Sequence, residues 1–281
     1  MRSILITGCS SGLGAALARQ CAKTGWSTYG TVRKSEDIAA LEEAGVVALI
    51  CDVRDAEAVN AAVARVIEDH GRIDALVANA AVGYVRSTEQ VDMDEMQDVM
   101  DINFWGVVRC VKAVLPHMRA RKAGRIVGVT SVGGLVGQPF GDIYCASKFA
   151  IEGYFESLAT YAGVAFGIDF TLVEPGGISS DFAKNVLARM EETGGIYEDD
   201  YAPLLQRYMT GGGVRGESVF QTPDQAAEVV RDVLEMDSPP LRIRTSDWAR
   251  DLCHLKTAAD PTGLELRDTV VRIMMGEDLL A

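Results

Sequence analysis

The sequence predicts an α/β fold, a doubly wound and mostly parallel sheet of seven strands with helices on both faces. Short apolar runs alternate with amphipathic stretches of helix length, which is typical of such a sheet. Runs such as ALVAN and RIVGV are apolar at both their odd and their even positions, as expected of strands that are buried on both faces. The expected strands are 3–7, 26–32, 46–51, 73–78, 124–130, 168–173 and 241–245, and the expected helices include 12–24, 55–70, 92–121 and 144–162.

Composition narrows the class of protein. The chain has 281 residues, of which 48% are apolar, so it can bury a sizeable core. Its net charge of −13 disfavours nucleic acid and anionic lipid as partners. No apolar run is long enough to span a bilayer, and a strand-like run already starts at Ile4. Six scattered cysteines fit reduced thiols, and three isolated histidines give no metal-site spacing. We therefore expect a cytoplasmic protein without a metal or a membrane partner.

The first strand runs into a glycine turn and the start of a helix, in the stretch ILITGCSSGLG (4–14). Small residues at Gly8, Gly12 and Gly14 let backbone amides approach a pyrophosphate at the positive end of the helix. The glycine spacing alone is also compatible with an ordinary tight turn. A second strand follows about 20 residues later, where dinucleotide sites select the ribose. The residues expected to hold the cofactor here are Gly8, Ser10, Ser11, Gly12, Leu13 and Gly14.

The end of the second strand favours NADP over NAD. It carries Arg33 and Lys34, with no acid until Glu36. An arginine fork donates two hydrogen bonds to one anion and therefore suits a 2′-phosphate. The hydroxyl group of Ser10 could add a further contact to this phosphate. The alternative is an exposed basic pair on a loop, and NAD stays possible.

Polar residues also follow the third and fourth strands. Asp52, in CDV with Val53, could accept from the adenine amino group, or it could cap the helix expected from Asp55. Asn79 closes the fourth strand and is either a cofactor contact or a turn residue. The small residues Ala80 and Ala81 after it allow close backbone approach.

The stretch IYCASKFA (143–150) places a phenol and an ammonium four residues apart. On a helix, Tyr144 and Lys148 would share one face. The pair could be an ordinary surface contact. It could also be chemical, because a nearby cation favours the phenolate and lowers the pKa of a tyrosine.

Seven motifs in order carry a resemblance to the short-chain dehydrogenase/reductase family, over about residues 2–245. They are TGCSSGLG (7–14), CDV (51–53), NAA (79–81), Asn103 in MDINFWG, Ser131 in VTSVGG, YCASK (144–148) and EPGGISS (174–180). NAA stands where the family more often has NAG, and Ser180 keeps a hydroxyl where a threonine is commoner. The stretch SVGGLVGQPFGDIYCASKFAIEG resembles the branch with the estradiol 17β-dehydrogenases and retinol dehydrogenases, which prefers NADP and often acts on bulky apolar alcohols.

The resemblance implies a Rossmann-type fold and a role for each matching residue. Tyr144 would be the general acid/base, and Ser131 would donate to the substrate oxygen. Lys148 would hold the nicotinamide ribose and lower the pKa of Tyr144. Asn103 would help hold a water connected to Lys148, or it is simply a tolerated buried amide. Pro175, Gly176, Ile178 and Ser180 would border the nicotinamide.

We expect a single domain over residues 1–281. Residues 179–222 form an insertion with two apolar stripes, Phe182-Val186-Met190 and Tyr201-Leu204-Leu205-Tyr208. With glycines at its borders (EETGG and TGGGVRG), it is either a substrate lid or a helical pair packed on the core or on a subunit. A helical extension, opened by Asp260-Pro261, is expected within 246–281. A homodimer or homotetramer would form through the helices at 92–121 and 144–162.

The predicted function is an NADP-dependent oxidoreductase. It would interconvert a secondary alcohol and a ketone or aldehyde, on a bulky apolar, cyclic or aromatic small molecule. The alternative is a non-catalytic NADP-binding sensor or regulator on the same fold. The intact set of Asn103, Ser131, Tyr144 and Lys148 argues against a sensor. A sugar-nucleotide epimerase would share Tyr144 and Lys148 but usually has a longer C-terminal half.

Overall fold

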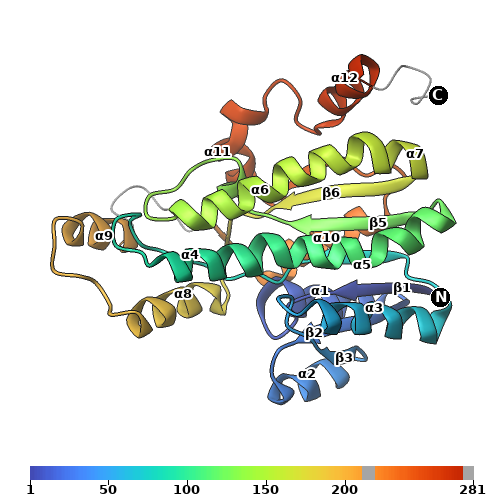
Figure 1. Cartoon of the computed structure of the whole chain (residues 1–281), viewed down its shortest axis with the longest axis horizontal. Helices are drawn as coiled ribbons and strands as arrows, with labels where there is room; N and C mark the ends of the chain where they lie inside the picture. The colour runs from blue at the N-terminus through green and yellow to red at the C-terminus, as the bar shows by residue number, and fades with distance from the viewer. Residues whose placement is uncertain (211–218, 275–281) are drawn as a thin grey trace.

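The computed structural model describes residues 1–210 and 219–274. Its centre is a parallel seven-stranded sheet in the order β3-β2-β1-β4-β5-β6-β9, which confirms the predicted fold class (Figure 1). The strands are β1 Arg2–Ile6, β2 Trp26–Val32, β3 Val47–Ile50, β4 Ala75–Ala78, β5 Gly124–Val129, β6 Ile168–Glu174 and β9 Arg242–Arg244. The order reverses between β1 and β4, where parallel sheets open a crevice for ligands.

Helices cover both faces of the sheet. One face carries α3 (Ala56–His70), α5 (Gly106–Arg121) and α6 (Asp142–Leu158), whose apolar sides form one buried cluster with the strands. The other face carries α1 (Gly12–Lys23), α2 (Ile38–Glu42) and α10 (Pro223–Glu235), which contribute to a second cluster.

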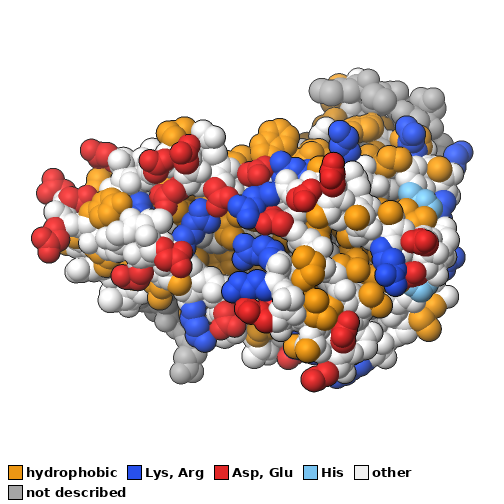
Figure 2. All heavy atoms as spheres, turned by 60° about the horizontal axis from the view of Figure 1, so that its bottom comes forward, with side chains coloured by type: hydrophobic (Ala, Val, Ile, Leu, Met, Phe, Trp, Pro, Cys, Tyr) orange, Lys and Arg blue, Asp and Glu red, His pale blue; other side chains and the backbone are white. Residues whose placement is uncertain are grey.

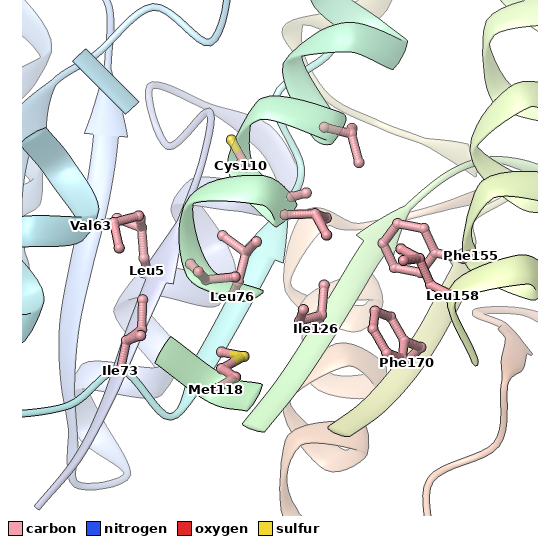
Figure 3. Close-up of a cluster of buried hydrophobic side chains, with 14 of the residues drawn as sticks. Leu5, Val63, Ile73, Leu76, Cys110, Met118, Ile126, Phe155, Leu158 and Phe170 are labelled. Atoms are coloured by element: carbon pink, nitrogen blue, oxygen red, sulfur yellow. The ribbon is translucent and has the colours of Figure 1, made fainter. Parts of the chain in front are cut away.

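The first cluster is the larger core (Figure 3). Phe155 of α6 is fully buried there, and its ring meets the Phe170 ring of β6 edge-on with centroids 6.0 Å apart. A Cβ atom at Gly128 would lie 2.7 Å from the Phe155 ring, so this strand position must be glycine for the helix to pack so closely. This packing fixes α6, the helix that carries Tyr144 and Lys148.

The long helices differ in detail from the prediction. The segment expected at 92–121 consists of α4 (Met93–Met100), a π-helical turn (Asp101–Trp105) and α5. Helix α6 begins at Asp142, two residues before the expected start at 144, and continues through a second π-helical turn (Ala159–Gly163) into α7 (Val164–Phe166).

The insertion holds α8 (Asp181–Glu192) and α9 (Ala202–Met209), which lie beyond the carboxyl ends of the strands (Figure 1). Helix α8 packs its Phe182 and Val186 on Gly83, where an added Cβ would meet them at 2.8 and 2.3 Å. The second predicted apolar stripe, which includes Leu204 and Leu205, is not buried as a whole, because Leu205 is buried and Leu204 is 56% exposed. Most of the glycine-rich stretch TGGGVRG lies outside the described residues.

A buried arginine anchors the far end of α8. Arg86 is 2% exposed, and its guanidinium donates to the carbonyls of Met190, Thr193 and Gly195 at 3.2 to 3.3 Å. It also lies 4.4 Å from the centre of the Tyr197 ring. The orphan carbonyls at the end of the helix are satisfied in this way.

The insertion ends at a two-residue parallel pair, β7 (Gly177–Ile178) with β8 (Phe220–Gln221), which the sequence did not predict. Thr222 then caps α10, and Gln225 completes a capping box. The C-terminal extension holds α11 (Asp247–Thr257) and α12 (Leu264–Met274). The prediction that Asp260-Pro261 opens the last helix was wrong in detail: the helix starts at Leu264, and the Asp260 carboxylate accepts from the amides of Gly263 and Leu266. Across the described ranges, no helix is both long and apolar enough to cross a membrane.

Candidate active site

A cavity of about 990 Å³ opens at the carboxyl ends of the central strands, between the sheet and α8. Figure 2 shows it as a hollow beside which Lys and Arg side chains gather. All the residues predicted for catalysis or cofactor binding line it, except Gly14 and Asn103. The structure therefore brings together side chains that the sequence scatters from Gly8 to Ser180.

The glycine loop has the geometry that the sequence required. Gly8 and Gly12 have φ of 72° and 59°, a region that favours glycine. A Cβ atom at Gly14 would lie 2.3 Å from the Gly8 carbonyl oxygen, so Gly14 permits the close packing of α1 on the loop instead of lining the cavity. Ser11 is the N-cap of α1 but forms no side-chain cap, which leaves the first amides of the helix for a ligand.

The Asn79 side chain holds the glycine loop in place. Its Nδ2 donates to the carbonyl oxygens of Thr7 and Gly8 at 2.9 and 3.0 Å. In return, Thr7 Oγ1 accepts from the amides of Asn79 and Ala80, each at 3.0 Å. Thr7 escaped the sequence analysis, because a threonine at a strand end gives no pattern of its own.

Arg33 and Lys34 follow β2 at the rim of the cavity, and both are exposed. Lys34 pairs with Glu36 at 3.2 Å on the surface. Arg33 forms no hydrogen bond or ion pair with the described residues. Its guanidinium therefore stays available for an anion, although an exposed position is also what a plain surface residue would have.

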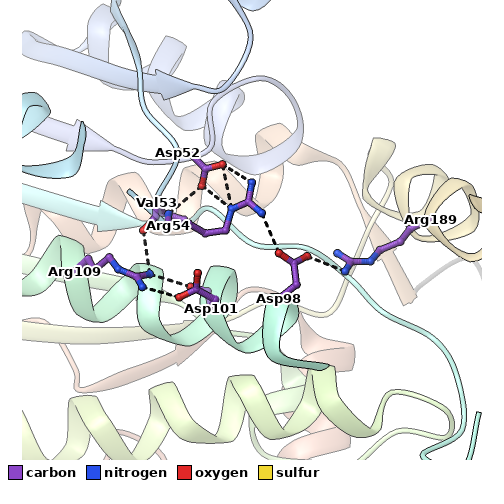
Figure 4. Close-up of polar contacts among 7 residues, drawn as sticks. All are labelled: Asp52, Val53, Arg54, Asp98, Asp101, Arg109 and Arg189. Atoms are coloured by element: carbon purple, nitrogen blue, oxygen red, sulfur yellow. Dashed lines mark hydrogen bonds and ion pairs between the residues drawn. The ribbon is translucent and has the colours of Figure 1, made fainter. Parts of the chain in front are cut away.

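Asp52 is held by a residue that the sequence analysis missed (Figure 4). Both carboxylate oxygens accept from Arg54, at 2.6 Å for Nη2. These hydrogen bonds hold the pKa of Asp52 below its usual value, although burial opposes them. The alternative that Asp52 caps α3 is wrong, because Asp55 is the cap and accepts from the amides of Glu57 and Ala58.

Arg54 also starts a chain of ion pairs across the mouth of the cavity. Its Nη1 contacts Asp98 of α4 at 3.0 Å, and Asp98 in turn contacts Arg189 of α8 at 2.8 Å (Figure 4). The insertion is thus tied to the wall that carries Asp52. Asp98 and Arg189 lie in helices whose sequence gave no sign of this contact.

Ser131, Tyr144 and Lys148 lie together at the inner end of the cavity. Ser131 follows β5, accepts from the Gly133 amide at 3.0 Å and is hydrogen-bonded to Tyr144. The Lys148 Nζ atom lies 5.8 Å from the centre of the Tyr144 ring and donates to the Val129 carbonyl at 3.0 Å. The three side chains therefore lie close enough together to act on one functional group of a bound molecule.

The pKa values differ from the expectation that Lys148 activates the phenol. Burial raises the pKa of Tyr144 to about 12, and the hydrogen bond with Ser131 opposes this. Burial also lowers the pKa of Lys148 to about 8. In this structure the loss of solvation dominates the pKa of Tyr144, so Tyr144 is a neutral phenol near pH 7.

Asn103 lies behind the cavity, in the π-helical turn before α5, and is fully buried. Its Oδ1 accepts from the Val82 amide at 2.8 Å, and its Nδ2 donates to the Val82 carbonyl at 2.9 Å and to Ser147 Oγ at 3.1 Å. The side chain thus joins the loop after β4 to α6. This fits the reading of Asn103 as a satisfied buried amide.

The loop after β6 forms the remaining wall with Pro175, Gly176, Ile178 and Ser180. Ser180 Oγ accepts from the Phe182 amide at 3.4 Å as the N-cap of α8. The Phe182 ring centre is 6.0 Å from that of Tyr144. Helix α8 therefore starts against the site and covers it with an aromatic ring.

Comparison with known proteins defines the class as nicotinamide-dependent oxidoreductases. Residues 2–191 match the family described as short chain dehydrogenase, and the chain belongs to this family. It is 38% identical to retinol dehydrogenase 8 of Bos taurus, over 93% of this chain and 86% of that protein. It is 36% identical to human 17-beta-hydroxysteroid dehydrogenase type 1, over 98% of this chain and 86% of that protein.

Solved structures agree with the assignment. A short-chain dehydrogenase from Streptomyces avermitilis superposes with a TM-score of 0.77 at 29% identity, covering 97% of this chain and 98% of that one. An actinorhodin polyketide ketoreductase with NADPH superposes with a TM-score of 0.72 at 28% identity, covering 87% and 95%. The chain is thus an enzyme of the alcohol and carbonyl oxidoreductase type.

Proposed function

We propose that this enzyme uses NADP to interconvert a secondary alcohol and a ketone or aldehyde. The carrying observation is that Ser131, Tyr144 and Lys148, the last one helical turn from Tyr144, line the same cavity as the glycine loop. The nicotinamide supplies the hydride when it is bound.

The residues of the chain fit the remaining tasks. The free amides at the start of α1 bind the pyrophosphate, Asp52 meets the adenine amino group and Arg33 meets the 2′-phosphate. Ser131 holds the carbonyl oxygen, and Tyr144 donates a proton to it as negative charge develops. Because burial raises its pKa, the phenol of Tyr144 holds its proton at neutral pH and can donate it. Lys148 lines the cavity and holds the nicotinamide ribose.

The substrate is a bulky apolar, cyclic or aromatic carbonyl compound. Phe182 presents an aromatic face next to Tyr144. The names of similar proteins also refer to large apolar molecules, namely retinol, a 17-beta-hydroxysteroid and, at 40% identity over 73% of both chains, the 3-ketodihydrosphingosine of a reductase from Bacteroides thetaiotaomicron.

We further propose that α8 and α9 act as the substrate lid. The lid would move only at the Phe182 end of α8, because Arg86 holds the other end of this helix. The exposed aromatic side chains Trp105, Phe149 and Tyr161, on or next to α5 and α6, fit the proposed contact between subunits of a homodimer or homotetramer.

The test is the loss of NADPH absorbance with a panel of cyclic and aromatic ketones. Tyr144→Phe should lower turnover by about 10²–10⁴-fold and leave NADPH binding intact. Tyr161→Phe, an exposed tyrosine at the end of the same helix, is the matched control. Full activity of Tyr144→Phe would remove the acid role, and a wild-type enzyme that binds NADPH but reduces no ketone would favour a sensor.

Cofactor choice is tested separately. Arg33→Ala should weaken NADPH far more than NADH, because only NADPH carries the 2′-phosphate. Arg65→Ala, at a surface ion pair of α3, should change neither affinity. An equal loss for both cofactors with Arg33→Ala would contradict the preference for NADP.

A further inference from the structure

A cluster of buried charged residues lies directly behind Lys148, outside the cavity. Glu152 is one turn further along α6 and 5% exposed, and Glu174 at the end of β6 is fully buried. Arg242 and Arg244 of β9 face Glu174, with N to O distances of 3.9 and 3.1 Å. The proposed reaction uses none of these four residues.

The hydrogen bonds leave one oxygen of each carboxyl group without a donor. Thr130 Oγ1 donates to Glu152 Oε1 at 2.6 Å, and Arg244 Nη1 donates to Glu174 Oε2 at 3.1 Å. Glu152 Oε2 and Glu174 Oε1 are buried and have no donor among the described residues. Glu152 and Glu174 repel each other as two buried anions, and a proton on either one removes this repulsion. A proton shared between the two remaining oxygens would also give each of them a hydrogen-bond partner.

The electrostatics agree with this arrangement. Burial raises the pKa of Glu152 well above its usual value, and the charge of Glu174 raises it further. Burial also raises the pKa of Glu174, while Arg244 and Arg242 oppose the rise. For Lys148, burial lowers the pKa to about 8 and Glu152 opposes this. The charge of Lys148 therefore depends on how negative Glu152 is.

We propose that Glu152 is a positioning residue that keeps Lys148 positively charged, and that it shares one proton with Glu174. The role in catalysis rests on the function proposed above. When the proton lies on Glu174, Glu152 is an anion one turn from Lys148 and stabilises the ammonium. When the proton lies on Glu152, that support is lost. The titratable groups that face Glu152 are Lys148 and Glu156 of α6, Glu174 of β6, Arg242 and Arg244 of β9 and Cys253 of α11.

Two isosteric substitutions should have opposite effects. Glu152→Gln removes the anion, so the pKa of Lys148 should fall by about one pH unit. Glu174→Gln removes the competitor for the proton and can donate to Glu152, so the pKa of Lys148 should rise. NMR of isotope-labelled lysine side chains in the cofactor-free protein measures both shifts, with Lys148→Arg to assign the signal. The high-pH limb of kcat/KM for ketone reduction should move in the same directions.

Glu156→Gln is the matched control, because it makes the same change one turn further along α6, at a side chain that is 39% exposed and paired with Arg242. Glu156 is only one of several charges that act on Glu152, so this substitution should move the pKa of Lys148 much less than Glu152→Gln does. Thr130→Val removes the hydrogen bond to Glu152 and should shift Lys148 in the same direction as Glu152→Gln, which keeps a test available if Glu152→Gln does not fold.

Shifts of the same sign in Glu152→Gln and Glu174→Gln, or no shift in either folded variant, would overturn the proposal. Because the NMR titration needs no turnover, it tests the shared proton even if no ketone is reduced. Absence of turnover in the wild-type enzyme would instead count against the proposed function.

Discussion

The carboxylate of Asp98 joins two guanidinium groups that belong to distant parts of the chain. Arg54 contacts it at 3.0 Å and Arg189 at 2.8 Å, which ties α8 to the wall of the cavity that carries Asp52. Arg189 lies in the last turn of α8, so this contact and Arg86 together hold that end of the helix against the cavity that would take the dinucleotide. Asp98→Asn should therefore weaken NADPH binding.

The expected loss of NADPH affinity can be estimated from the solvent exposure of the three ion-paired side chains. The side chains of Arg54, Asp98 and Arg189 are 42%, 33% and 22% exposed, so solvent screens both pairs. Such pairs contribute about 0.2–1 kcal/mol each, and the two together about 0.5–2 kcal/mol. This corresponds to a roughly 2- to 30-fold increase in the Kd of NADPH. The difference from the wild type should shrink at high salt, where the ion pairs are screened.

The assay is the fluorescence of NADPH on binding, at low and at high ionic strength. Asp94→Asn is the control, because it removes an exposed acid from the same helix. Removal of negative charge alone should slightly strengthen the binding of an anionic cofactor to a protein with a net charge of −13. Asp94→Asn and Asp98→Asn should thus act in opposite directions. Equal effects of the two substitutions, or an unchanged Kd for Asp98→Asn at low salt, would refute the reasoning.

Three further substitutions test the fold, at the site and away from it. Gly14→Ala would place a Cβ 2.3 Å from the Gly8 carbonyl oxygen, so it should lower stability by about 1–3 kcal/mol and weaken NADPH; Gly153→Ala, in open space on α6, should not. Both are measured by urea unfolding. Burial alone would raise the pKa of Asp74, but the Ser3 amide and nearby arginines hold it below its usual value. Asp74 therefore stabilises the fold above its unfolded pKa and loses this effect as the pH falls, so melting temperatures of Asp74→Asn should fall less steeply with acid than those of the wild type. Thr222→Ala removes the cap of α10 and should cost about 1 kcal/mol, visible as a lower unfolding midpoint, and an unchanged midpoint would argue against the capping box.

The sequence predicted the sheet and its main helices because long periodic runs leave a clear pattern. It also predicted many residues of the cavity, since most of them follow a strand whose carboxyl end lies at one edge of the sheet, and Tyr144 and Lys148 share one face of α6. It missed Thr7 and Arg54 because their roles arise only when separate loops meet. The β7–β8 pair is too short for any periodicity. The raised pKa of Tyr144 was not foreseen, because a sequence shows which charges are neighbours but not how much solvent each one loses.

The anchor at the end of α8 has a consequence for how this segment can change. Arg86 recognises mainly main-chain oxygens, which every amino acid provides. The exposed side chains of Glu191 and Glu192 can therefore be exchanged while the helix still stops at the same point. Thr193, whose Oγ1 accepts from Arg86 at 2.8 Å, and the glycines at 194 and 195, with φ of 102° and 69°, are less replaceable. Grafts that alter substrate preference should be tolerated here, provided that the arginine and the helical path leading to it are retained.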